Sequence, residues 1–179
     1  NAERFEELTQ VAAQESARVK DPKKQVEFKL LAAKGLSRSG QKDAAQGVYK
    51  EVMKAEGLKP EETKAAKLGV AQNMIAQGQA EEALVFLASE DARQNLTADE
   101  ILFLRGEAFR KLGRKDEALA EYAKISGLAG SNFRDEALLA QAYLHSESGE
   151  FAKGVESFRA FLTAFPDAEF APKAFSDLI

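Results

Sequence analysis

The chain has no cysteine, one histidine and only four prolines in 179 residues. Without cysteine, disulfides and thiolate metal sites are excluded. The lone His145 has no second histidine or cysteine with which to complete a soft metal site, so we interpret it as a surface residue. Few prolines, together with abundant alanine, glutamate, lysine, leucine and glutamine, favour helix over sheet.

Basic patches, long apolar runs and catalytic motifs are also missing. A net charge of −4 is unlike the basic charge of a nucleic-acid-binding domain. No apolar run approaches the roughly 20 residues of a membrane span. There is no metalloprotease motif, nucleophile elbow or phosphate loop. We therefore expect no enzymatic activity, no cofactor and no nucleic-acid partner. The content of 45% hydrophobic and 30% charged residues indicates a soluble, folded protein.

What the chain does have is a glycine repeat. Gly40, Gly78, Gly113 and Gly149 follow one another at steps of 38, 35 and 36 residues. Five residues after each glycine comes a small residue: Ala45, Ala83, Ala118 and Gly154. Each glycine lies between two segments of helical apolar periodicity. This pattern predicts a stack of helical hairpins, in which glycine makes the turn and the small residue allows close helix contact.

Turn and capping residues divide the chain further. Asp21-Pro22 and Pro60 are typical helix starts, and Thr97 with Glu100 fits a capping box. Asn1-Ala2 resembles the remnant of a cleaved tag, and residues 171–175 read as a helix cut short, which suggests a piece of a longer protein. The predicted segments are an N-terminal helix in 1–21, hairpin units at 22–57, 58–94, 95–130 and 131–168, and the start of a terminal or capping helix in 169–179.

These residues resemble the tetratricopeptide repeat (TPR) family over about residues 26–175. The third unit fits best, with Leu102, Gly106, Phe109, Gly113, Ala118, Tyr122 and Ile125. The fourth unit departs from the pattern, because Tyr143 to Gly149 is two residues longer than the usual step from aromatic residue to glycine, which predicts an elongated helix or turn. The resemblance implies an all-α, right-handed α-solenoid of about four hairpins with an extra helix at each end.

A TPR stack implies a non-catalytic scaffold that binds a peptide or helix of a partner protein in its concave groove, lined by the first helix of each unit. Leu30, Leu68 and Phe103 would add apolar contacts. The alternative for each polar residue is an ordinary solvent-exposed side chain, and a small-ligand or enzymatic domain would need a closed pocket that no motif indicates. The predicted groove residues are Lys34, Arg38, Gln72, Asn73, Glu107, Arg110 and Gln141.

Some TPR proteins hold the acidic tail of a chaperone through a carboxylate clamp of lysine, asparagine and arginine on successive first helices. Here Lys34 supplies one such cation, but Gln72 and Glu107 occupy the corresponding positions of the next units. Glu107 would repel a terminal carboxylate. We therefore expect that this groove does not bind the acidic chaperone tail.

The densest aromatic stretch lies near the C-terminus, and its helical spacing places most of it in the core: Phe151, Phe158, Phe161, Phe165, Phe170 and Phe175. The last apolar face would lack a partner unless the helix near Phe175 covers it or another chain pairs with it. This gives an alternative function, a structural or oligomerisation segment of a bacterial envelope assembly that acts through its exposed ends, with self-association through its terminal helices. Residues 149–172 also resemble TPR proteins of the bacterial cell envelope, which favours a periplasmic or envelope location over the cytoplasm.

Overall fold

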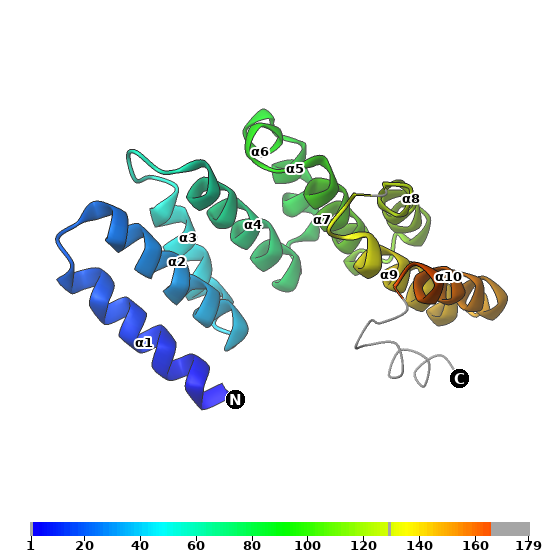
Figure 1. The fold of residues 1–179 in the computed structure, drawn as a ribbon, viewed down its shortest axis with the longest axis horizontal. Helices are drawn as coiled ribbons and strands as arrows, with labels where there is room; N and C mark the ends of the chain where they lie inside the picture. Colours follow the sequence, from blue (N-terminus) through cyan, green and yellow to red (C-terminus); the bar gives the residue numbers. More distant parts are fainter. Residues whose placement is uncertain (1, 129, 166–179) are drawn as a thin grey trace. The chain divides into compact units, whose positions relative to one another are not determined.

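The computed structural model describes residues 2–128 and 130–165, and in these residues it contains ten α-helices and no strand. The predicted all-α fold of repeated helices is confirmed. The helices fall into two compact units, residues 1–96 and residues 97–179, which are coloured blue to green and green to orange in Figure 1. Each unit is described by itself.

Unit 1 begins with a helix that pairs with the first predicted hairpin. Helix α1 packs against α2, α2 against α3, and α3 against α4, while α2 also contacts α4. Asp21 caps α2 as expected, because its Oδ1 accepts a 3.0 Å hydrogen bond from the Lys23 N–H. The helices of unit 1 are α1 (Ala2–Arg18), α2 (Pro22–Arg38), α3 (Lys42–Val52), α4 (Pro60–Ala76), α5 (Ala80–Ala88) and α6 (Glu90–Asn95).

A core cluster of unit 1 is formed by one stripe on each of the three helices α2, α3 and α4. Its buried residues are Val26, Leu30, Ala33, Ala45, Tyr49, Val52, Ala66 and Val70. Ala45 and Ala83, which follow the turn glycines by five residues, are both fully buried. Their small side chains let the two helices of each hairpin approach closely, as the repeat predicted.

Unit 2 consists of two hairpins, α7 (Ala98–Lys111) with α8 (Lys115–Ser126) and α9 (Arg134–Glu147) with α10 (Phe151–Ala164). Each helix packs against the next along the chain. Phe158 and Phe161 are buried against Leu138 and Ala142, and burial of each phenylalanine contributes roughly 2–3 kcal/mol.

One member of the predicted aromatic core lies elsewhere. The Phe151 side chain is 64% exposed. It is the first residue of α10, two turns before the buried Phe158 on the same face of the helix. The prediction was wrong for this residue. Phe170, Phe175 and the predicted helix in 169–179 lie outside the described residues.

The four repeat glycines form the same turn. Their φ angles are 84°, 81°, 70° and 73°, in the left-handed region where glycine has no Cβ penalty. After each glycine, the next N–H bonds back to a carbonyl in the preceding helix, and this carbonyl belongs to Leu36, Met74, Phe109 or His145. This is the Schellman arrangement that ends a helix, so the predicted hairpin turns are confirmed.

The predicted elongation of the fourth unit is wrong. Helices α7 and α9 both have 14 residues, and each is followed by a C-cap residue, the glycine and one N-cap residue before the next helix begins. His145, not Tyr143, stands where Phe109 stands in the third unit, four residues before the turn glycine. The prediction matched Tyr143 to Phe109 because both are aromatic. The equivalent residue is instead the one at the same distance from the turn glycine.

His145 is also more enclosed than a surface residue. Its side chain is 14% exposed, and its Nδ1 lies 2.7 Å from Glu150 Oε2. Lys115 and Lys153 donate to the same carboxylate, at 2.6 and 3.2 Å. Glu150 therefore connects the first residue of α8 with the C-terminus of α9 and the start of α10.

Two helix starts use a glutamate to satisfy a backbone N–H. The Thr97 N–H donates a 2.8 Å hydrogen bond to Glu100 Oε2, and the Lys59 N–H makes the same contact with Glu62 Oε2. Both glutamates are buried. The predicted pairing of Thr97 with Glu100 is confirmed in this half of the capping box.

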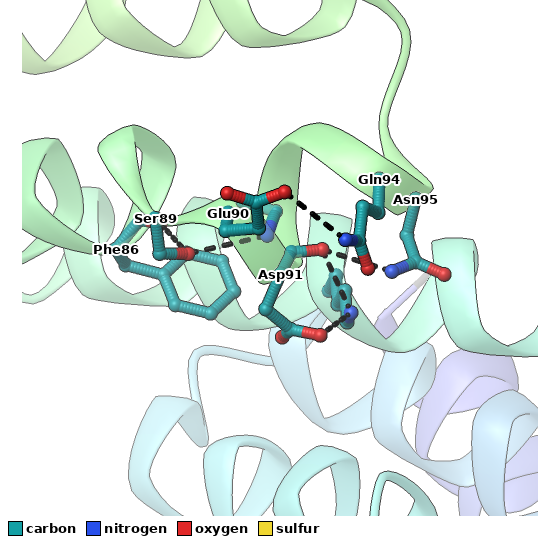
Figure 2. A network of polar contacts seen from close by, with 8 residues as sticks. Phe86, Ser89, Glu90, Asp91, Gln94 and Asn95 are labelled. Atoms are coloured by element: carbon teal, nitrogen blue, oxygen red, sulfur yellow. Dashed lines mark hydrogen bonds and ion pairs between the residues drawn. The ribbon is translucent and has the colours of Figure 1, made fainter.

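Helix α6 was not predicted. Figure 2 shows its polar contacts: Ser89 Oγ accepts from the Ala92 N–H at 3.2 Å and donates to the Phe86 carbonyl at 2.7 Å. Lys67, from α4, donates to Asp91 Oδ1 at 2.6 Å and to the Asp91 carbonyl at 3.0 Å. A nearly buried ammonium group therefore attaches this short helix to α4.

Two glycines outside the turns permit close packing. A Cβ on Gly106 would lie 2.5 Å from Tyr122 Cε1, and a Cβ on Gly69 would overlap the ring of Tyr49. Both tyrosines are buried, at 0% and 3% exposure. Glycine at these positions lets the first helix lie directly on the aromatic ring.

Candidate functional site

Each unit has a hollow between two first helices. The hollow of unit 1 has a volume of about 290 Å³ and lies between α2 and α4. The hollow of unit 2 has a volume of about 340 Å³ and lies between α7 and α9. We call them hollow 1 and hollow 2. Hollow 1 is lined by Lys34, Ser37, Arg38, Tyr49, Ala65, Leu68, Gly69 and Gln72. Hollow 2 is lined by Phe103, Glu107, Arg110, Glu136, Leu139, Ala140, Tyr143 and Glu147.

The two hollows are built from the same register positions. The residue six before each turn glycine is Lys34, Gln72, Glu107 or Tyr143, and all four line a hollow. The residue ten before the glycine provides the apolar contacts of Leu68, Phe103 and Leu139. Because the helices have the same phase relative to their turns, the same face is presented in both units.

Hollow 1 has a cationic rim over a tyrosine. Lys34 and Arg38 stand one turn apart on α2, and both are exposed. Burial raises the pKa of the Tyr49 phenol, although Ser37 and Arg38 act in the opposite direction. Among the eight lining residues there is no carboxylate, so hollow 1 can attract an anionic group.

Hollow 2 contains a fixed network of three side chains. The Tyr122 hydroxyl donates to Glu107 Oε1 at 2.6 Å, and Arg110 donates to both oxygens of the same carboxylate at 3.2 and 2.7 Å. Burial would raise the pKa of Glu107, but the hydrogen bonds from Arg110 and Tyr122 outweigh it and lower the pKa. Burial raises the pKa of Tyr122, and the Glu107 carboxylate adds to that effect. Glu107 therefore stays ionised.

The walls of hollow 2 are aromatic and acidic. The ring of Phe103 stacks on that of Phe133 with centroids 5.0 Å apart, which fixes one wall. Glu136 and Glu147 lie on α9 and reach solvent. Desolvation, and then the neighbouring Asp135, raise the pKa of Glu136 to about 7.

The structure brings together five of the seven predicted groove residues, in two groups. Lys34, Arg38 and Gln72 line hollow 1, whereas Glu107 and Arg110 line hollow 2. Asn73 instead lies inside unit 1 with 2% exposure, where its Oδ1 accepts a 2.9 Å hydrogen bond from Ser37 Oγ. Gln141 is half-buried on α9 and does not line hollow 2.

The apolar groove residues divide in the same way. Leu68 and Phe103 line the hollows, but Leu30 belongs to the core of unit 1. Sequence reasoning missed Glu136, Leu139, Tyr143 and Glu147 in hollow 2. Counting back from Gly149 would have found them, because they occupy the positions of Ala65, Leu68, Gln72 and Arg38 relative to the turn glycines of their own helices.

In residues 2–128 and 130–165, no three histidine, aspartate or glutamate side chains gather into a group that could hold a metal ion. None of the helices in the described part of the chain has both the length and the apolarity that a bilayer span requires.

Comparison with known families agrees with this geometry. A family model described as tetratricopeptide repeat matches residues 100–126 and 136–168, which fall on α7–α8 and on α9–α10. The two hairpins of unit 2 therefore match tetratricopeptide repeats. Repeats of this family generally mediate contacts between proteins and are typically non-catalytic. No curated protein matches the chain significantly.

Proposed function

We propose that this chain is a non-catalytic scaffold, and that each of hollow 1 and hollow 2 can hold a segment of a partner protein. The observation that carries the proposal is the shared register: the same helix positions open a hollow in each unit. Most buried residues of the same helices lie at other positions, such as Ala33, Ala71, Gly106 and Ala142. Tyr49 also belongs to the core of unit 1, and Leu139 and Tyr143 pack against that of unit 2.

Each hollow combines an apolar contact with a polar rim, which is the usual composition of a recognition site. An apolar side chain of the partner would contact Leu68 in hollow 1, or Phe103 and Leu139 in hollow 2. Burial of one such side chain contributes roughly 1.5–3 kcal/mol. The charged rim then discriminates between partners, because a mismatched charge loses its solvation without gaining a partner.

A protein segment fits these sites better than nucleic acid or a cofactor. Hollow 2 has three carboxylates around one guanidinium, and a phosphate backbone would be repelled there. The charge of hollow 1 comes from two cations only, which is far from the extended basic surface of a nucleic-acid binder.

The proposal can be tested by selecting displayed random peptides of about 16 residues on the full chain and measuring the affinity of the selected peptides. For peptides that depend on hollow 1, the variant K34E/R38E should lose about tenfold or more in affinity, because two attractive charges become repulsive. The binding site is located by amide chemical shifts, which should change around Leu68 and Gln72 or around Leu139 and Tyr143.

The matched control for hollow 1 is K50E/K54E. It makes the same change in charge, with the same spacing, on the exposed part of α3 and its following turn. If K50E/K54E weakens binding as much as K34E/R38E, the loss of affinity comes from the net charge of the chain and not from hollow 1. The proposal is wrong if selected peptides bind tightly but shift neither set of hollow residues.

A second candidate function is association through the end of unit 2. On α10, Phe151 is 64% exposed and Val155, one turn later, is 45% exposed. If this face pairs with another copy, the sedimentation coefficient of the chain should rise with concentration, and F151S/V155S should abolish that rise. A monomer at every concentration would remove this candidate while leaving the groove proposal intact.

A further inference from the structure

We propose that hollow 2 takes a lysine or arginine side chain of the partner, placed next to an apolar residue of the same segment. This inference rests on the proposed function and names the chemistry of the occupant. It is specific to hollow 2, because hollow 1 has the opposite charge.

The lining charges of hollow 2 do not balance. Glu107, Glu136 and Glu147 contribute three carboxylates, and Arg110 contributes the one cation among the eight lining residues. That cation is already engaged, since Arg110 holds Glu107 through two hydrogen bonds at 2.7 and 3.2 Å. Glu136 and Glu147 are therefore left to attract a cation from outside.

The electrostatics of Glu136 agree with this imbalance. Its pKa is raised to about 7, first by desolvation and then by Asp135. The other charged groups near the hollow are Glu107 and Arg110 on α7, with Lys111 just beyond them, and Glu147 on α9. A cation placed beside Glu136 would supply a counter-charge there and favour the ionised form of Glu136.

The apolar part of hollow 2 suits the stem of a long cationic side chain. Phe103 and Leu139 offer apolar surface, and Tyr143 offers an aromatic face beside Glu147. Lysine and arginine bury their methylene stems along such surface while the charged end meets carboxylates or a ring face. A partner glutamate would face the same carboxylates and be repelled.

Hollow 1 provides an internal comparison. At the register position of Glu107 and Tyr143 it has Lys34 and Gln72. Two residues before a turn glycine, hollow 1 has Arg38 on its first helix, α2, whereas hollow 2 has Glu147 on its second helix, α9. The backbone frame is the same but the charge is reversed. A cationic probe should therefore choose hollow 2 over hollow 1.

The test uses three matched, N-acetylated and C-amidated tripeptides on the full chain: Leu-Lys-Leu, Leu-norleucine-Leu and Leu-Glu-Leu. Amide chemical shifts report both the dissociation constant and the hollow that is occupied. Leu-Lys-Leu should shift the residues of hollow 2 and bind about fivefold to tenfold more tightly there than Leu-norleucine-Leu. Leu-Glu-Leu should bind hollow 2 most weakly.

The preference for lysine should fall below about twofold in E136Q/E147Q, and it should persist in D116N/E156Q, which removes two exposed carboxylates elsewhere in unit 2. The single variants E136Q and E147Q, both at exposed positions, provide the same test if the double variant does not fold. Equal binding of the lysine and norleucine peptides in hollow 2, or a preference that survives E136Q/E147Q, overturns this inference alone. Failure of all three tripeptides to shift either hollow overturns the proposed function as well.

Discussion

The hydroxyl of Tyr122 donates a 2.6 Å hydrogen bond to Oε1 of Glu107. Tyr122 is fully buried, whereas Glu107 lines hollow 2 with 24% of its side chain exposed. One end of this contact therefore belongs to the core of unit 2 and the other end to its candidate binding surface. A change in the core can in this way alter the electrostatics of the hollow.

The variant Y122F should lower the free energy of unfolding by about 1–2 kcal/mol, because Glu107 loses a donor in a partly buried place. The pKa of Glu107 should rise, since the Tyr122 hydrogen bond helps to lower it. The stabilisation from a lowered pKa is present above the unfolded-state value and is lost as pH falls through the folded-state value. Urea denaturation at pH 7 and pH 3, with an NMR titration of Glu107, measures both effects. An unchanged pKa would show that Arg110 alone controls this carboxylate.

The variant G106A should destabilise unit 2 by about 1–3 kcal/mol, because the added methyl group would overlap the Tyr122 ring and the buried ring has no room to move. The distance of 2.5 Å to Tyr122 Cε1 is far below van der Waals contact. The matched control is G47A on α3, where a Cβ meets nothing within 4 Å. It should be neutral or more stable by about 0.5–1 kcal/mol. Thermal unfolding of the two variants gives the comparison, and equal effects would contradict the packing argument.

Removing the carboxylate of the Lys67–Asp91 pair should lower the stability of the chain more than removing its ammonium group. The Lys67 side chain is 5% exposed and that of Asp91 is 68% exposed. In D91A, the buried ammonium group of Lys67 keeps only the backbone carbonyl of residue 91 as a partner. In K67M, an apolar side chain of similar length replaces the ammonium group. We expect lower unfolding temperatures for D91A than for K67M. The reverse order would mean that the methionine fails to pack between α4 and α6.

The Glu150 carboxylate should make the stability of the folded chain depend on pH in the acid range. Its pKa is lowered to about 2 by Lys115, then by His145 and Lys153. Its stabilising contribution is complete above the unfolded-state pKa of about 4.3 and is lost as pH falls from there towards 2. E150Q should therefore unfold at a lower temperature than the parent chain at pH 6, and the gap should close near pH 2. E156Q, an exposed carboxylate on the same helix, serves as the control, and a gap that is constant with pH would contradict the assignment.

The hairpin architecture was predictable because backbone constraints leave strong signals in sequence. A left-handed turn selects glycine, and close helix contact selects alanine, so Gly113 and Ala118 mark their places without any knowledge of the tertiary structure. The polar segment of α6 has no apolar periodicity, and its attachment depends on Lys67, a residue type seldom found buried. That helix was therefore not predictable from periodicity.

The candidate site was predictable in part, and its errors have one physical cause. Asn73 was predicted to line the groove and His145 to lie on the surface. Their register says otherwise. Asn73 stands five residues before its turn glycine, where Gly35, Ala108 and Leu144 are also buried. Distance from the turn determines which way a side chain faces, and chemistry then determines what it does there.

The position six residues before the turn glycine has a consequence for how this protein could be altered. It holds Lys34, Gln72, Glu107 and Tyr143 on four similar helices, and a hollow receives each one. Lys34 and Gln72 are exposed, so exchanging them leaves the packing of unit 1 untouched. In unit 1, the residues that contact a partner can therefore be changed one at a time while the fold stays the same.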